Sequence, residues 1–143
     1  MIKLDFRKSS VISFLLAVCS LSTLACPPGD FQRLLDEEKR CHDIEFTQQH
    51  IACMKASHKS LQTYVTKQLK WVYRNFPVDT RQRADAALQK RLSINEAKCK
   101  TEMIAFGPGT LGPRRYAFCV NEGIKALEKE ITVTGSNFLN SEL

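Results

Sequence analysis

The number and placement of the cysteines constrain this chain more than any other feature. The sequence has six, at positions 19, 26, 41, 53, 99 and 119. Cys19 falls within an apolar run at 11–25 that follows a basic start at 3–8, and this order is typical of a secretory signal peptide. The run is short for a membrane-spanning helix, which takes about 20 apolar residues. We therefore predict that residues 1–25 are a cleaved signal peptide, with a retained membrane anchor as the alternative.

Cleavage leaves five cysteines, and an exported chain meets an oxidising compartment in which thiols pair. Because five is odd, one cysteine needs another fate. The stretch Ser22–Cys26, with Ala25 before the cysteine, resembles a bacterial lipobox. That resemblance implies a lipid on Cys26, where several acyl chains together give stable anchoring. The alternative is a plain signal-peptidase cut after Ala25, which leaves Cys26 as a free or intermolecular thiol.

Removing residues 1–25 from 143 leaves 118, enough for one domain with a modest core. The signal contains three of the 21 basic and one of the 15 acidic residues, so the remainder carries 18 and 14, a net charge of +4. The two signs are interleaved along the sequence, which favours a solvated surface, and we expect no nucleic-acid partner. Pro27 follows Cys26, and by resemblance to Gram-negative sorting rules it permits delivery to the outer membrane.

Helical periodicity dominates the mature chain. Asp30 can cap a short helix, so residues 26–40 are expected to be a tether with a short helix. A stripe of apolar residues at three- and four-residue steps predicts a long helix over 47–76, capped by Thr47 and ended before Pro77. A weaker stripe predicts a second helix over 80–106.

The glycines and prolines of 107–113 predict a loop, and Pro113 can start a last helix that runs to Ile131. Residues 132–143 are expected to be a frayed tail. With no alternating strand pattern, the predicted fold is all-α: a small helical bundle, or a long helical hairpin with a third packed helix, stapled by two disulfides.

Four cysteines allow three pairings. We prefer the local one, Cys41 with Cys53 and Cys99 with Cys119, because neighbouring helices share short connections. The first bridge would pin the N-terminal segment to the long helix, and the second would tie the two later helices together. In the chain-entropy model each loop closure contributes roughly 3 kcal/mol.

The cysteine frame resembles a known family. The segments CHDIEFTQQHIAC, LQKRLSINEAKC and FGPGTLGPRRYAFCVNEGIKALEKEI are similar to the three cysteine-bearing segments of the LprI-type lysozyme inhibitor family. The resemblance covers 41–131, the expected LprI-like helical domain, and departs from the family pattern at Leu92, Glu96 and Leu127, where the family has tryptophan, arginine and arginine. It implies a small exported or lipid-anchored helical protein with paired cysteines, and lysozyme inhibition as its activity.

Inhibition of a lysozyme requires a stiff element that enters a cleft holding two carboxylates. Segment 107–116 is the candidate, because prolines lower the entropy lost on docking and arginines make charge-assisted bonds to carboxylates. We therefore expect Arg114, Arg115 and Tyr116 to bind the partner. The alternative is an ordinary helix-linking loop with solvated arginines.

Other chemistry has less support in the sequence. His42, His50 and His58 lie near Cys41 and Cys53, but the spacing matches no zinc template and oxidised cysteines cannot ligate, so we expect no metal and no cofactor. Motifs for hydrolase, metalloprotease or phosphate-binding sites are missing, and we predict that the protein is not an enzyme. The aromatic side chains of 64–73 are expected to pack in the core, or to touch a partner or envelope surface with an unpacked face.

These inferences predict an exported, periplasmic protein, held to the outer membrane through Cys26, that binds and inhibits a lysozyme-type muramidase. One alternative is an immunity or accessory protein that blocks another peptidoglycan-directed enzyme. The other is a structural envelope lipoprotein with no inhibitory target.

Overall fold

The computed structural model of the protein describes residues 29–142, so the predicted signal peptide and Cys26 lie outside the described residues. All regular structure in this range is helical. It comprises α2 (Phe31–His42), α3 (Thr47–Val72), α4 (Val78–Ala105), α5 (Leu111–Thr134) and a final 3₁₀ helix, η1 (Gly135–Glu142). The all-α prediction is confirmed. Across residues 29–142, no helix combines the length and apolar character needed to cross a membrane.

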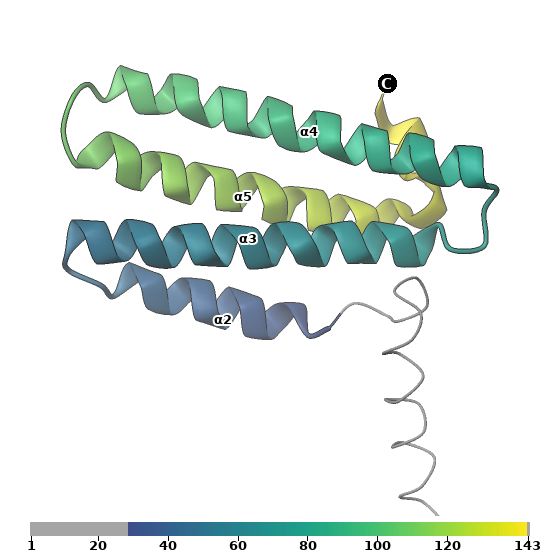
Figure 1. The fold of residues 1–143 in the computed structure, drawn as a ribbon, viewed down its shortest axis with the longest axis horizontal. Helices are drawn as coiled ribbons and strands as arrows, with labels where there is room; N and C mark the ends of the chain where they lie inside the picture. The colour runs from purple at the N-terminus through teal and green to yellow at the C-terminus, as the bar shows by residue number, and fades with distance from the viewer. Residues whose placement is uncertain (1–28, 143) are drawn as a thin grey trace, which may run out of the picture.

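Each of the long helices α3, α4 and α5 runs antiparallel to the one before it, and α2 lies along the outer side of α3 (Figure 1). Helix α5 lies between α4 and α3 and packs on both. One end of the bundle carries the α2–α3 link at 43–46 and the α4–α5 loop at 106–110, and we call it the loop end. The opposite end carries the α3–α4 turn at 73–77, and we call it the turn end.

The core follows the stripe that the sequence shows on the long helix. Leu61, Val65 and Leu69 of α3 are fully buried, because their three- and four-residue spacing places them on one face. They share a cluster with apolar side chains from every other element, namely Leu34, Tyr73, Ala84, Ala87, Leu88, Leu92, Ile124, Leu127, Ile131 and Phe138. Burying each large side chain contributes about 1.5–3 kcal/mol. The described residues therefore enclose a core of their own.

Both predicted disulfides are present. Cys41–Cys53 joins the last turn of α2 to α3, and Cys99–Cys119 joins α4 to α5. Both lie toward the loop end, and Cys41 and Cys99 are buried. Such bonds persist in a non-reducing environment, which these two therefore indicate for the protein.

Helix boundaries differ from the predicted ones by a few residues. Helix α3 ends at Val72 rather than Phe76, since the chain turns over 73–76, where the Phe76 amide donates to the Tyr73 carbonyl (3.0 Å). Asp30 does cap α2, and its carboxylate accepts from the Gln32 amide at 2.9 Å. Thr47 is the first helical residue of α3, and Phe46 takes the N-cap position without a side-chain hydrogen bond.

The expectation of a frayed tail at 132–143 is wrong. Helix α5 continues to Thr134, and Gly135, with φ of 53°, turns the chain into η1. Phe138 is fully buried and belongs to the core cluster. The Tyr73 hydroxyl donates to the Ser136 carbonyl (2.8 Å) and accepts from the Leu139 amide (3.2 Å). Burial of one aromatic ring and two hydrogen bonds to a core tyrosine therefore order this segment.

One charged group lies inside the bundle. Glu38 of α2 is only 3% exposed, and its carboxylate accepts from the Lys125 ammonium of α5 at 3.1 Å. Lys125 also pairs with Glu122. Burial acts to lower the pKa of Lys125, but its hydrogen bonds to Glu122 and Glu38 outweigh burial and raise that pKa above its ordinary value. The buried carboxylate of Glu38 thus has a cation beside it.

Candidate partner-binding site

The α4–α5 loop is a tight connection that only glycine permits. Gly107 and Gly109 have φ of 72° and 139°, a region that side-chain-bearing residues rarely adopt. Gly112, on the first turn of α5, lies against the end of α4: a Cβ there would be 3.0 Å from the Met103 carbonyl oxygen. The five loop residues, 106–110, therefore reverse the chain within a short span and bring α5 directly against α4.

Large apolar side chains are exposed at this end of the bundle. Ile104, Phe106 and Leu111, which flank or belong to the loop, are 67%, 48% and 61% exposed. Phe46, in the α2–α3 link at the same end, is 71% exposed. Apolar groups gathered at one place on a surface are typical of binding sites. The loop end therefore has the character of a contact surface.

The predicted binding residues lie on α5 and not on the loop itself. Helix α5 begins at Leu111, two residues before the predicted start at Pro113. Proline is tolerated there because the first amides of a helix have no intrahelical acceptor. The Arg114 amide is the first to donate back, to the Thr110 carbonyl at 3.4 Å. Segment 107–116 is thus a short loop followed by a helical turn.

Arg114, Arg115 and Tyr116 do not share one face, because successive helical residues point about 100° apart. Arg114 is half-buried and Arg115 is exposed, with its guanidinium 5.6 Å from the centre of the Phe118 ring. Tyr116 instead lines a cavity between the helices. Burial, and then the charge of Glu96, raise the pKa of the Tyr116 hydroxyl. The structure therefore leaves the two arginines at the surface and turns the tyrosine inward.

The cavity lies toward the loop end, over α5 and between α3 and α4. Its volume is about 360 Å³, and it is lined by Ile51, Met54, Lys55, His58, Met103, Pro113, Tyr116, Ala117 and Val120. His58 Nε2 lies 3.8 Å from a carboxylate oxygen of Glu96 across the gap between α3 and α4. A mostly apolar hollow with a few polar groups suits an apolar side chain of a binding partner.

Sequence reasoning missed this cavity. Ile51 and Met54 belong to the α3 stripe and Met103 to the α4 stripe, so their spacing indicates core packing. Whether a neighbouring helix packs against such a stripe or leaves a cavity depends on how far the two helices diverge. The spacing of apolar residues does not encode that divergence. Nothing in the sequence could therefore have distinguished the cavity lining from the rest of the core.

Crosslinks and packing stiffen the loop end. Cys99–Cys119 ties the last turns of α4 to the start of α5, close behind the loop. Cys41, Met54 and Ala117 form a buried cluster that joins α2, α3 and α5. His42 packs edge-on to Phe118, with ring centres 5.8 Å apart. The exposed apolar side chains therefore stand on a rigid base.

The histidines of this region have structural contacts. Nδ1 of His50 lies 2.8 Å from the Cys41 carbonyl oxygen, and the rings of His42 and His50 are 5.8 Å apart. Cys41 and Cys53 are joined to each other and have no thiolate to offer. Among residues 29–142, no cluster of three or more His, Cys, Asp and Glu side chains is placed to hold a metal ion.

No family model, curated protein or solved structure matches the chain. The expected kinship with LprI-type lysozyme inhibitors therefore stays a prediction.

Proposed function

We propose that this protein is an exported, lipid-anchored binding protein of the periplasm that inhibits a lysozyme-type muramidase with its loop end. The observation that carries the proposal is the exposure of Ile104, Phe106 and Leu111 on and beside a loop that is braced by a disulfide and followed by two arginines. Apolar side chains exposed together mark contact surfaces, and arginine is enriched among the energetically important residues of interfaces.

Inhibition follows from the chemistry of the target. A muramidase cleft holds an acid and a second carboxylate a few ångströms apart, flanking the scissile bond. The loop 106–110 can occupy the cleft, with Phe106 and Leu111 against apolar sugar-binding surfaces. Arg114 and Arg115 then supply donors to the acidic groups at the cleft rim. Because the loop is stiff beforehand, little conformational entropy is lost on docking.

The direct test is the clearing of a peptidoglycan suspension by a panel of lysozymes, with and without the mature chain carrying Cys26→Ser. We expect slower clearing with at least one lysozyme. If none is slowed, inhibition of lysozymes is rejected and the alternatives remain, namely immunity against another cell-wall enzyme or a structural role.

The contact surface is tested on the lysozyme that is slowed. Arg114→Ala with Arg115→Ala, and separately Phe106→Ser with Leu111→Ser, should each weaken inhibition by at least about tenfold, the effect of 1.4 kcal/mol. Lys59→Ala with Lys90→Ala is the matched control, because both lysines are exposed and lie away from the loop end. Full potency of both loop-end variants would place the contact elsewhere.

Anchoring is tested by fatty-acid labelling in cells. Wild-type protein should incorporate label and fractionate with the outer membrane, whereas Cys26→Ser should do neither. Equal labelling of the two would reject the lipid on Cys26.

A further inference from the structure

The segment 67–83, which forms the α3–α4 turn and the helix ends beside it, is rich in positive charge. Between residues 67 and 83 there are five basic side chains, Lys67, Lys70, Arg74, Arg81 and Arg83, and one acidic side chain, Asp79. That net charge of +4 equals the net charge of the whole mature chain. All of these side chains are exposed except Arg81, which is half-buried. Basic and acidic residues elsewhere in the mature chain balance one another.

Aromatic and apolar side chains accompany these charges. Trp71, the single tryptophan of the chain, is half-buried at the end of α3, with the Arg74 guanidinium 3.8 Å above its ring. Phe76 and Val78, in and after the α3–α4 turn, are 37% and 54% exposed. Tryptophan and phenylalanine beside lysine and arginine form the mixture that favours the interface between water and a lipid bilayer.

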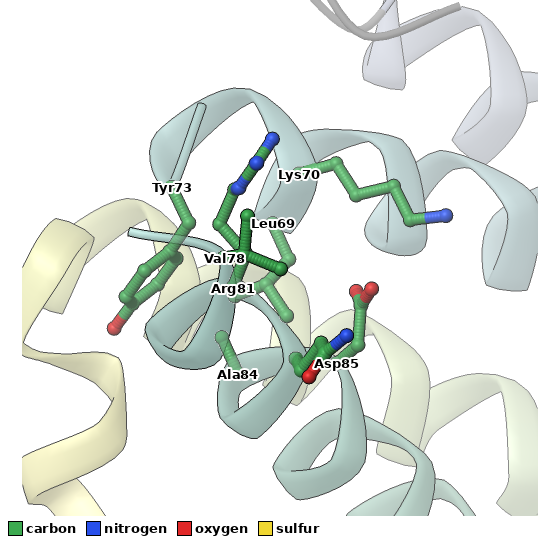
Figure 2. Close-up of a pocket in the computed structure, with 8 residues that line it drawn as sticks. Leu69, Lys70, Tyr73, Val78, Arg81, Ala84 and Asp85 are labelled. Carbon is green, nitrogen blue, oxygen red and sulfur yellow. The ribbon is translucent and has the colours of Figure 1, made fainter. Parts of the chain in front are cut away.

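A small hollow at the same end lies between α3 and α4. It measures about 180 Å³ and is lined by Leu69, Lys70, Tyr73, Val78, Arg81, Gln82, Ala84 and Asp85 (Figure 2). Among the described residues, the buried Nε–H of Arg81 has no acceptor. Asp85 provides one negative charge on the wall, against the two positive charges of Lys70 and Arg81. An unpaired cationic donor in a hollow of this size suits an anionic headgroup.

The course of the chain places Cys26 within reach of this end. Helix α2 starts beside α3, where the rings of Phe31 and Tyr64 are 4.9 Å apart. From Tyr64, α3 continues for eight residues to Val72, a rise of about 12 Å. The five residues from Cys26 to Phe31 can span up to about 17 Å. A group attached at Cys26 can therefore reach the level of the α3–α4 turn.

We infer that the turn end is a membrane-contact surface that rests on an anionic phospholipid bilayer. Trp71 and Phe76 enter the interfacial region, and Lys67, Lys70, Arg74 and Arg83 lie over the headgroups. This contact fixes the orientation of the bundle, so that α3, α4 and α5 stand away from the bilayer and the loop end faces the periplasmic space. The inference adds an orientation to the proposed lipid anchor, and its test does not depend on natural lipidation.

Cys26 supplies the handle for the experiment, because the other four cysteines of the mature chain are paired. Mature protein is coupled through Cys26 to a maleimide phospholipid in vesicles of phosphatidylglycerol and phosphatidylcholine. Bromine-labelled lipid in the same vesicles quenches an indole that enters the bilayer, and Trp71 is the only one present. We expect a blue-shifted Trp71 emission that bromolipid quenches, and weaker quenching in pure phosphatidylcholine or at high salt.

Charge variants test the surface itself. Each lysine near an anionic bilayer contributes about fivefold to binding. Lys67→Glu with Lys70→Glu should therefore lower the ratio of bilayer-bound protein, whose Trp71 is quenched, to unbound protein by at least about tenfold. Lys98→Glu with Lys100→Glu makes the same charge change on exposed residues of α4 toward the loop end, and should leave quenching intact.

Three results would overturn the inference: Trp71 emission unchanged on tethered protein, equal loss of quenching in both variants, or a shift with soluble heparin but not with vesicles. The last would assign the surface to a soluble polyanion. None of them bears on lysozyme inhibition, which is measured in solution on Cys26→Ser protein.

Discussion

At the scale of single residues, the pair formed by Glu38 and Lys125 places a charge inside the bundle. A carboxylate that is 3% exposed is stable only beside its cation, 3.1 Å away. We predict that Lys125→Met lowers the free energy of unfolding by about 3 kcal/mol, because it leaves a buried charge without a partner. Urea denaturation followed by circular dichroism measures the change.

The double variant Glu38→Gln with Lys125→Met separates the charge from the packing. Since both charges are then gone, the double variant should recover at least half of the lost stability. If the double variant is less stable than the single one, the ion pair is not the cause. The pair was invisible in the sequence, where 36–40 reads as an ordinary charged surface; only packing of α2 against α3 and α5 encloses Glu38.

At the scale of elements, η1 is held to the bundle by a carboxylate. Glu130 accepts from Arg91 at 2.5 Å and from the Ser141 hydroxyl at 2.6 Å. Burial alone would raise the pKa of Glu130, but the hydrogen bonds from Ser141 and Arg91 lower it below its ordinary value of 4.5. A lowered pKa means that this contribution to stability is present above pH 4.5 and is lost as the pH falls through the lower folded-state value.

We therefore predict that η1 loosens as the pH falls below about 4.5, and that Glu130→Gln reduces this dependence of η1 on pH. Hydrogen exchange of residues 135–142, measured from pH 6 downward and corrected for intrinsic rates, should show protection falling below about pH 4.5 in the wild type. In Glu130→Gln, protection should be weaker and nearly flat over that range. A wild-type profile without a fall would contradict the assignment.

The elements also show what a sequence pattern can and cannot specify. Periodic apolar stripes located α3, α4 and α5 to within a few residues, and Asp30 marked the start of α2. Short connections made the local disulfide pairing the favoured one, and it is the pairing found. Helix η1 was missed because it has no period long enough to recognise, and Phe138 is ordered by the core cluster, which exists only once the bundle has formed.

The candidate site was predicted less completely than the fold. The Gly/Pro segment identified the loop, but the exposure of Ile104 and the inward turn of Tyr116 depend on how α3, α4 and α5 pack together. The start of α5 lies two residues earlier than Pro113 suggests, because proline is accepted within the first turn and not only at its first position.

At the scale of the whole molecule, both disulfides constrain the loop end, whereas packing, hydrogen bonds and an ion pair hold the elements at the turn end together. We predict that Cys99→Ser with Cys119→Ser lowers the free energy of unfolding by about 3 kcal/mol and weakens lysozyme inhibition. Cys41→Ser with Cys53→Ser should cost a similar amount of stability but leave more of the inhibition, since it does not close the α4–α5 loop. Thermal unfolding and the clearing assay measure the two effects. Equal loss of inhibition in both variants would show that inhibition does not depend on the rigidity of the α4–α5 loop.

The bridge between Cys41 and Cys53 has a mechanical consequence. A protein held at residue 26 and gripped at its far end is pulled along its length, and the load enters through α2, which packs mainly by side-chain contacts with α3. Because the force is parallel to the two helices, α2 would have to slide along α3 and break these contacts together, as in shear. The sulfur bridge sits at the end of α2 remote from the pull, so once α2 is stripped the load passes from Cys41 directly to Cys53 and bypasses the link at 43–46.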